Sequence, residues 1–381
     1  MAKQKIVVHN KSDRPDNVVA REAEIMAECT AIEALLPRFM RGYFIYLKGN
    51  VLPKTRLAYL QDVRFFCEYL INETALTEAE DIKDIKLSDF NKIKAVDINL
   101  FIDYCRHYTV TGEDGTIYVY ENSNKSLARK KSSVSVLFKQ LYRDELLDKN
   151  ITDGFDPIRV PKAGEKEIKA LQDDEVMIML DAVSTGAGLT KHELAYWQRT
   201  KKRDKAILIL FLTYGLRLSE LWQLNIDSFN FHRGEFKIYR KRGKESVMPL
   251  NDSVTAVIHD YIDNERPRND ELDPAEQDAL FLSIQGKRMT ERQVRELVKK
   301  YTSIALGTSR RAGYSPHKLR ATAATSLIGR GNSIYDVAAL LDHEQVTTTQ
   351  LYARHKQDVK RNLVRDMEWE KERLEGIKDD K

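Results

Sequence analysis

The sequence predicts a mainly α-helical protein of two domains, with a small β-hairpin or sheet in the C-terminal domain. Apolar residues recur at helical spacing through most of the 381 residues, of which 42% are hydrophobic and 31% charged. A chain of this length exceeds one typical domain. Residues 150–168 contain two prolines, two glycines and no periodicity, which is typical of a linker between domains.

The first domain is predicted to be a compact group of helices. Residues 1–28 are polar and weakly patterned, so we expect an extension or arm before the first helix. The spacing of apolar residues predicts helices over residues 32–49, 54–71, 96–108 and 125–147. Pro37 predicts a break or kink in the first of them. Residues 109–122 carry β-branched residues and the turn sequence GEDG, which predict a small hairpin or ordered loop.

The second domain is predicted to open at Leu171. Asp173 or Asp174 is a suitable N-cap for the helix that follows. Residues 203–214 form a strongly apolar helix. Residues 234–250 alternate apolar and polar around the sequence RKRGKE, which predicts a β-hairpin with a basic tip. The chain after this hairpin is predicted to be mostly helical.

Composition and cysteine usage narrow the class of protein. No run of about 18 apolar residues exists, and the N-terminus lacks the apolar core of a signal peptide, so we expect a cytoplasmic protein. Cys29, Cys67 and Cys105 are scattered and are expected to be reduced thiols. No histidine and cysteine cluster has zinc-like spacing, so we expect no metal.

Three short segments carry residues suited to cutting a phosphodiester without a metal ion. They read TYGLRLSEL at 213–221, SPHKLR at 315–320 and LDHEQVTTTQLY at 341–352. Their candidate catalytic side chains are Arg217, His317, Arg320, His343 and Tyr352. Arginines bind non-bridging oxygens and stabilise transition-state charge, histidines transfer protons near neutral pH, and a tyrosine hydroxyl can attack. The order and spacing carry the inference, because each residue type alone is common.

These motifs resemble those of tyrosine recombinases, and most closely the Xer-type site-specific recombinases. That family carries Arg-x-x-Glu-Leu after a hydrophobic helix, here starting at Arg217, and His-x-Leu-Arg, here starting at His317. It also carries Leu-Gly-His followed nine residues later by the nucleophilic tyrosine, here His343 and Tyr352. Asp342 stands where the family usually has glycine. Because aspartate tolerates left-handed turns and caps helices, we expect this difference to affect local geometry alone.

The resemblance implies a role for each side chain that matches the family's motifs. Arg217 and Arg320 would clamp the scissile phosphate, and lysine would be a poor substitute for either. His317 would accept the tyrosine proton and His343 would donate a hydrogen bond to a non-bridging oxygen. The sequence does not fix this division between the two histidines.

The leaving 5′ oxygen needs a general acid, which in the family is a lysine on the hairpin turn. Lys241 aligns best with that position, and Lys244 is the alternative. Glu220 either orients a neighbouring residue or is an ordinary helical partner of Arg217. A 3′-phosphotyrosine retains the bond energy, so we expect no cofactor, neither ATP nor a divalent metal.

The resemblance also implies a two-domain, C-shaped clamp around double-stranded DNA. The predicted parts are an N-terminal extension (1–28), a helical core-binding domain (29–152), a linker (153–168), a catalytic domain (169–360) and an amphipathic tail helix (361–381). In the tail, apolar residues share one helical face: Leu363, Met367, Leu374 and Ile377. Such a tail implies a homotetramer on two DNA sites, formed from a monomer or weak dimer, with a DNA translocase or accessory protein as a further partner and no membrane.

Basic residues gather in three stretches, although the net charge is only +4. The stretches are residues 125–131, 199–205 and 237–244. Each stretch alone is as consistent with a solvated face as with DNA contact. Because they occur together with the catalytic motifs, we expect a DNA-facing surface in a nucleoid-associated protein. The candidate DNA contacts are Arg56, Lys125, Arg129, Lys130, Lys131, Arg240, Arg242 and Lys244.

Three alternatives stay open at this point. A type IB topoisomerase shares the phosphotyrosine chemistry but needs only one active protomer. A DNA-binding protein that has lost catalysis would show a decayed set of active-site residues, and this chain keeps them all. Among recombinases, the enzyme either resolves chromosome dimers or integrates and excises a mobile element. The short N-terminal extension favours the Xer-like role, because integrases with arm sites usually carry a separate arm-binding domain.

Overall fold

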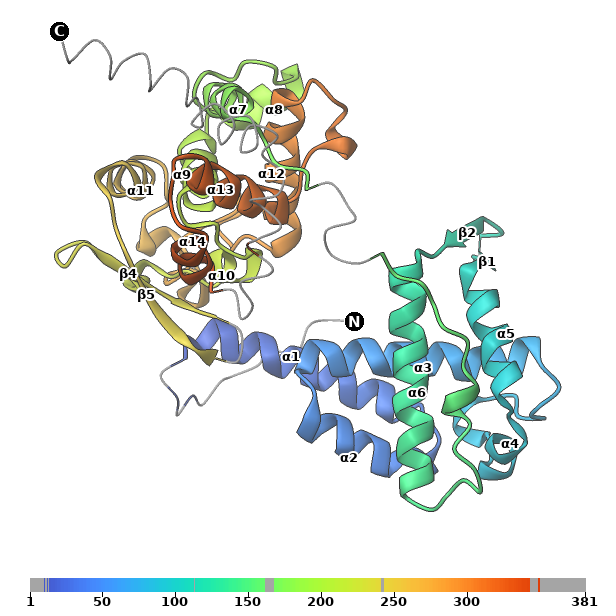
Figure 1. Cartoon of the computed structure of the whole chain (residues 1–381). Helices are drawn as coiled ribbons and strands as arrows, with labels where there is room; N and C mark the ends of the chain where they lie inside the picture. Colours follow the sequence, from blue (N-terminus) through green and yellow to red (C-terminus); the bar gives the residue numbers. More distant parts are fainter. Residues whose placement is uncertain are drawn as a thin grey trace, which may run out of the picture. The chain divides into compact units, whose positions relative to one another are not determined.

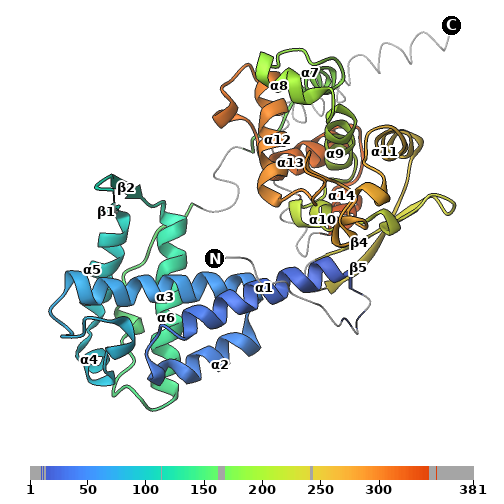
Figure 2. The ribbon, with the colours of Figure 1, turned by 180° about the vertical axis from the view of Figure 1, so that it is seen from behind.

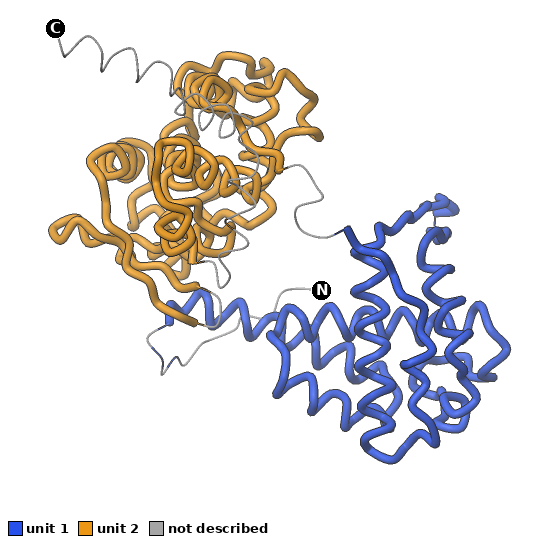
Figure 3. Tube along the Cα trace, viewed as in Figure 1, with its two compact units in different colours: residues 1–161 blue, residues 162–381 orange. Residues whose placement is uncertain are grey.

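The computed structural model describes residues 10, 12, 14–112, 114–161, 168–240, 243–342 and 349. The chain divides into two compact units, residues 1–161 and residues 162–381 (Figure 3). Each unit has its own core of buried apolar side chains. Because the two cores are separate, each unit is described by itself.

Unit 1 is a helical bundle built around the long helix α3. Its elements are α1 (Asp16–Glu33), η1 (Arg38–Met40), α2 (Arg41–Asn50), α3 (Pro53–Glu73), η2 (Ile82–Asp84), α4 (Leu87–Lys92), α5 (Ala95–Arg106), β1 (His107–Thr111), β2 (Ile117–Glu121), α6 (Asn124–Arg143) and η3 (Thr152–Gly154). Helices α1 and α6 both pack against α3 (Figure 1), and Figure 2 shows the same crossing from behind. Leu60, Val63, Phe66 and Leu70 lie buried three or four residues apart, which gives α3 its apolar face.

Aromatic rings fill the centre of unit 1. Phe66 meets Phe101 edge-on with 5.0 Å between ring centroids, and Phe90 stacks on Phe138 at 5.6 Å. All four rings are fully buried. Rings at these separations add attraction beyond their burial, so α3, α4, α5 and α6 are joined at one centre.

The hairpin predicted between the third and fourth helices is confirmed. Strands β1 and β2 pair antiparallel with Tyr108 opposite Tyr120, and their rings stack at 5.0 Å. Tyr108 also stacks on Tyr104 of α5 at 5.6 Å, so the base of the hairpin rests on the bundle. Ile117 and Val119 on β2 are exposed.

The start of the first helix corrects the sequence analysis. We expected helical structure from about residue 29, whereas α1 begins at Asp16, directly after Pro15. Its apolar stripe is narrow, since only Ile25, Cys29 and Ile32 are buried against α3. None of residues 16–24 is buried, so the first half of the helix gave little periodicity. The predicted break at Pro37 is confirmed, because α1 ends at Glu33.

Unit 2 surrounds one central helix, α9. Its elements are α7 (Asp173–Thr185), α8 (Lys191–Trp197), α9 (Lys201–Tyr214), α10 (Leu218–Trp222), η4 (Ile226–Ser228), β3 (Phe229–Asn230), β4 (Glu235–Tyr239), β5 (Glu245–Pro249), α11 (Asp252–Asn264), η6 (Asn269–Glu271), η7 (Pro274–Glu276), α12 (Glu291–Ala305), η8 (Arg310–Ala312), α13 (Pro316–Gly329) and α14 (Ile334–Leu341). Helix α9 contacts α7, α11 and α13 (Figure 1). Its buried residues include three in a row, 206–208, so it is enclosed rather than amphipathic.

A three-stranded antiparallel sheet, in the order β3-β4-β5, lies beside these helices. It contains the hairpin that the sequence predicted over residues 234–250. Phe236 pairs with Met248 across β4 and β5, and both side chains are buried. The alternation of apolar and polar residues along β4 therefore places one face of the sheet on the core.

The N-cap of α7 is Gln172 rather than the predicted Asp173 or Asp174. The backbone N–H of Gln172 donates to the Glu175 carboxylate at 2.7 Å. Both aspartates lie in the first turn instead, where their negative charge is favourable beside the positive end of the helix.

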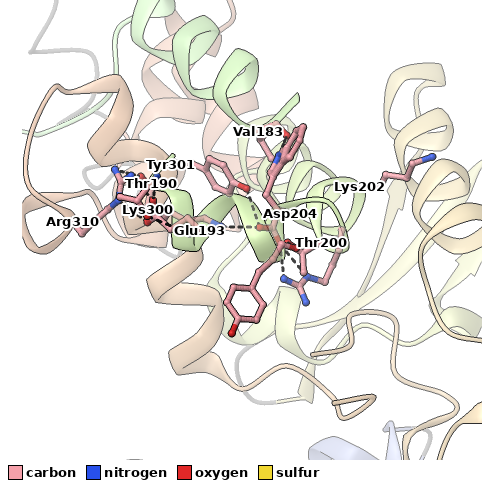
Figure 4. A network of polar contacts seen from close by, with 12 residues as sticks. Val183, Thr190, Glu193, Thr200, Lys202, Asp204, Lys300, Tyr301 and Arg310 are labelled. Carbon is pink, nitrogen blue, oxygen red and sulfur yellow. Dashed lines mark hydrogen bonds and ion pairs between the residues drawn. The ribbon is translucent and has the colours of Figure 1, made fainter. Parts of the chain in front are cut away.

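A buried carboxylate anchors the start of α9. Asp204 accepts hydrogen bonds from Lys300 Nζ and Tyr301 Oη of α12, both at 3.1 Å (Figure 4). Arg203 lies 2.7 Å from the same carboxylate. Burial and the Asp204 charge raise the pKa of Tyr301 well above its usual range, so its hydroxyl stays protonated. Part of the basic stretch 199–205 is therefore internal.

Candidate active site

Arg217 is placed by the turn that follows the central helix. Gly215 ends α9 in the left-handed region with φ +57°, where a Cβ atom would lie 2.5 Å from Leu341. Arg217 is then the N-cap of α10, and its backbone N–H donates to Glu220 at 2.8 Å. Its Nη1 donates to the other oxygen of Glu220 at 2.6 Å. Only glycine fits this turn without strain, so the turn fixes where the arginine begins.

Arg320 reaches the same place from α13. Its Nη1 donates to the carbonyl of Gly215 at 2.6 Å, and its Nη2 donates to the carbonyl of Leu341. Glu220 is 2% exposed and also lies 4.0 Å from Arg320. Glu220 therefore makes the i, i+3 pair with Arg217 that the sequence offered as one alternative, and the same buried carboxylate also lies beside Arg320.

A third arginine joins them from the sheet. Arg240 follows β4, is buried, and donates from Nη2 to the carbonyl of Leu340 at 2.9 Å. Arg217 Nη2 donates to the carbonyl of Asp342 at 3.1 Å. The carbonyls of residues 340, 341 and 342 are therefore each bonded by a different arginine. These carbonyls form the negative end of α14, where cations are favourable.

Asp342, the residue that follows α14, has left-handed backbone angles with φ 51° and ψ 53°. Its carboxylate accepts a hydrogen bond from Lys244 Nζ at 2.9 Å and lies 3.9 Å from Arg240 Nη1. Burial raises the pKa of Asp342, but the hydrogen bond from Lys244 and the charges of Arg240, Lys244 and Arg217 together lower it below the usual range. The expectation that this position affects geometry alone was incomplete, because the side chain is charged and paired.

His317 lies in the first turn of α13, exposed and one helical turn before Arg320. Lys241, Arg242, His343 and Tyr352 lie outside the described residues. Among the described tyrosines, Tyr301 is a poor candidate for the nucleophile, because it is fully buried against Asp204. Tyr335 on α14 is 70% exposed.

The predicted DNA contacts of unit 1 fall into two groups. Arg56 is 4% exposed and its guanidinium pairs with Glu33 of α1 at 3.0 Å from Nε. Its side chain ties α3 to α1 and does not face outward, and its contact with DNA stays a prediction. Lys130 is also buried, with Nζ 3.5 Å from Asp62 and 4.4 Å from the centre of the Phe65 ring.

The other three predicted DNA contacts on α6 remain accessible to different degrees. Lys125 is exposed in the first turn. Arg129 is 43% exposed and pairs with Asp62 through Nη1. Lys131 donates to the carbonyl of Asp156 at 2.6 Å. The sequence analysis missed Asp62, a buried carboxylate on α3 that contacts two of the four basic residues, because an aspartate among helical polar residues carries no signal of burial.

Among the residues that the structure describes, no group of three or more His, Cys, Asp or Glu side chains could hold a metal ion. No helix there is long and apolar enough to cross a membrane.

Comparison with known proteins identifies the family. The model of the Phage integrase family matches residues 169–358. Tyrosine recombinase XerC of Natranaerobius thermophilus is 32% identical over 284 residues, covering 73% of this chain and 84% of that protein. The chain belongs to the tyrosine recombinase family. Tyrosine recombinase XerD of Staphylococcus epidermidis is 30% identical over 285 residues, covering 74% and 88%. The protein is therefore a tyrosine-type site-specific DNA recombinase.

Solved recombinase structures share the fold. XerH site-specific recombinase bound to palindromic difH substrate gives a TM-score of 0.56 at 18% identity, covering 84% of this chain and 80% of that one. The Tn1549 transposon integrase in complex with circular intermediate DNA gives 0.54 at 20%, covering 86% and 99%. These likenesses confirm the predicted mainly helical fold with a small sheet.

Proposed function

We propose that this recombinase cuts and rejoins DNA through a 3′-phosphotyrosine on Tyr352, with Arg217 and Arg320 as the phosphate clamp. The observation that carries the proposal is the convergence of both arginines, from separate motifs, on Glu220 and on the end of α14. In the sequence, the third motif begins at that helix end and runs to Tyr352. The first two motifs thus meet at the end of α14, and the third motif starts there.

The proposed chemistry follows from charge. A tyrosine hydroxyl has an ordinary pKa of about 10, so attack requires removal of its proton and neutralisation of the phosphate charge. His317 accepts the proton while Oη forms a bond to phosphorus. The bond from phosphorus to the 5′ oxygen breaks, and Lys241 donates a proton to that oxygen. Two planar guanidinium groups stabilise the extra negative charge on the equatorial oxygens, and His343 donates to one of them.

Both units are proposed to contact the duplex, as a clamp. Lys125, Arg129 and Lys131 lie on α6 with accessible side chains, and Lys244 at the start of β5 is 68% exposed. Phosphate contacts of this kind fix position and register without reading sequence. Arg56 and Lys130 are left out of this set because they are buried. Arg242 stays in it on its sequence position alone.

The proposed biological role is Xer-like recombination between two DNA sites by a homotetramer in the cytoplasm. The curated relatives named above are XerC and XerD, and the XerH structure holds difH DNA in a post-cleavage complex. The tail at 361–381, which is outside the described residues, is proposed to link protomers through its apolar face. The Tn1549 integrase likeness keeps integration and excision of a mobile element as the competing outcome.

The test starts from the DNA that the protein attacks in cells. DNA fragments covalently attached to the expressed protein are sequenced, and a nicked duplex of the recovered site serves as a suicide substrate. Wild type and Tyr335→Phe are expected to form the covalent adduct, while Tyr352→Phe binds the duplex and forms none. An adduct with Tyr352→Phe contradicts the proposal. Fragments that map to one locus of the chromosome support the Xer-like role, because a chromosome dimer holds two copies of that locus. Fragments at the ends of a mobile element support integration.

A further inference from the structure

Asp342 places a carboxylate at the end of α14, and that carboxylate spans the two ends of the β4–β5 turn. Arg240 directly follows β4, and Lys244 directly precedes β5. Asp342 lies 3.9 Å from Arg240 Nη1 through one oxygen and 2.9 Å from Lys244 Nζ through the other. A single side chain at the end of α14 thus contacts both strand ends of a hairpin that lies far away in the sequence.

Asp342 is one of the two counter-charges of Arg240, together with Glu220. Its side chain is 3% exposed, and the only hydrogen bonds recorded for it among the described residues run from Nη2. Nε and Nη1 are buried without a hydrogen-bond partner in this part of the structure. Burial lowers the pKa of the guanidinium, while the charges of Glu220 and Asp342 oppose that shift. A buried cation of this kind is stable only beside negative charge, and Asp342 is the nearer carboxylate by its recorded ion pair.

Lys244 adds a weaker contact on the open side of the turn. It is 68% exposed, so its ion pair with Asp342 alone contributes little. The contact matters for geometry, because it holds the start of β5 against the same carboxylate as Arg240. Glycine at position 342 would keep the left-handed backbone without strain but would supply neither contact.

We propose that Asp342 is a positioning residue of this recombinase, which fixes the β4–β5 turn against the end of α14 through Arg240 and Lys244. The inference rests on the proposed function, because Lys241, the candidate general acid, is the residue after Arg240 in the chain. Holding both strand ends restricts where the residues between them can reach. Asp342 would therefore act on protonation of the leaving oxygen, through Arg240, without touching the DNA.

The variant that isolates the charge is Asp342→Asn, since asparagine adopts left-handed backbone angles as readily as aspartate. Asp336→Asn is the matched control, because it removes the same charge from the exposed first turn of the same helix. Each variant is assayed for covalent adduct on the suicide duplex and on the same duplex with sulfur at the 5′ bridging position. A thiolate leaves without a proton, so this substrate bypasses the general acid.

Asp342→Asn is expected to slow adduct formation on normal DNA at least tenfold. The upper limit is the full contribution of a general acid, roughly 10²- to 10⁴-fold. On the sulfur substrate its rate should return to within about threefold of wild type, as expected when only the general acid is lost. The control should match wild type on both. Equal impairment of Asp342→Asn on both substrates, or none on either, overturns the proposal. If wild type itself forms no adduct, the proposed function has failed instead.

A second measurement does not depend on the size of that defect. At saturating DNA, where loss of a phosphate contact by Lys244 does not limit the rate, Lys244→Met should slow cleavage of normal DNA in the wild-type background. It should have no further effect in the Asp342→Asn background, because Asp342→Asn already removes the Lys244 contact together with the Arg240 contact. Lys244 is exposed, so its replacement leaves the fold intact. Fully additive effects of the two changes would overturn a shared role.

Discussion

Cationic side chains are held in two different ways in the two units. In unit 1, Arg129 and Lys130 both pair with the buried carboxylate of Asp62. In unit 2, Arg217 and Arg320 donate to main-chain carbonyls at the end of α14 and share the single carboxylate of Glu220. A main-chain carbonyl orients a guanidinium without cancelling its charge. A carboxylate orients the cation and also neutralises its charge.

The difference separates basic residues that support the fold from those available to a phosphate. The unit 2 cluster holds three arginines, counting Arg240, against the carboxylates of Glu220 and Asp342, and each arginine also donates to a main-chain carbonyl. The Asp62 cluster of unit 1 has the same excess of one cation, but both of its cations pair directly with the one carboxylate, and one of them, Lys130, is buried. We therefore expect substitutions in unit 2 to act mainly on cleavage, and those around Asp62 mainly on stability.

The largest effect is expected from Arg217→Lys and Arg320→Lys. Lysine keeps the charge but loses the planar fork, so each change should slow adduct formation by about 10²- to 10³-fold, the cost of removing one transition-state donor. Single-turnover rates on the suicide duplex measure this, with binding affinity recorded in parallel. A loss confined to affinity would mean that these arginines bind DNA but do not stabilise the transition state.

Asp62→Asn sharpens the other side of the comparison. It leaves Lys130 buried without a full counter-charge, so the free energy of unfolding should fall by about 2–3 kcal/mol. This is below the cost of breaking a fully buried pair because Arg129 reaches water. Urea unfolding provides the measurement, and cleavage per folded molecule should change little. Unchanged stability would show that the charge of Asp62 contributes nothing to the stability of unit 1.

Glu193→Gln tests a carboxylate-held arginine inside unit 2. The hydrogen bonds from Arg310 lower the pKa of Glu193 to about 2. A lowered folded-state pKa stabilises the fold above the ordinary value near 4.5, and that stability is lost as pH falls toward 2. At pH 7 the free energy of unfolding of wild type should exceed that of the variant by about 1–2 kcal/mol, because the hydrogen bonds from Arg310 are charge-assisted. The difference should shrink between about pH 4.5 and 2, and a constant difference across that range would contradict this.

The smallest effect concerns the salt dependence of DNA binding. Arg129→Ala should reduce the slope of log affinity against log salt by about one unit if Arg129 neutralises one phosphate. Lys130→Ala should leave the slope unchanged, because that lysine is internal. Equal slopes for both variants would show that burial in the free protein does not predict which cation meets DNA.

The sequence predicted the fold well where one helix face is strongly apolar. Helices α3, α5 and α6 and both hairpins followed from periodicity, whereas α1 was placed late because its buried stripe is narrow. The arginine motifs located Arg217 and Arg320 because their neighbours form recognisable patterns. Charge alone gave no sign that Arg56 is buried, since its partner Glu33 lies on another helix and only the fold brings the two together.

The central claim is that the arginine cluster at the end of α14 serves cleavage by Tyr352. The most direct measurement traps the wild-type adduct on the suicide duplex, digests the protein and the DNA, and identifies the nucleotide-bearing residue by mass spectrometry. The account predicts one modified peptide, carrying a 3′-phosphate on Tyr352. A 3′-phosphate on Tyr335, Tyr301 or any other residue, or a 5′-phosphate linkage, would contradict it.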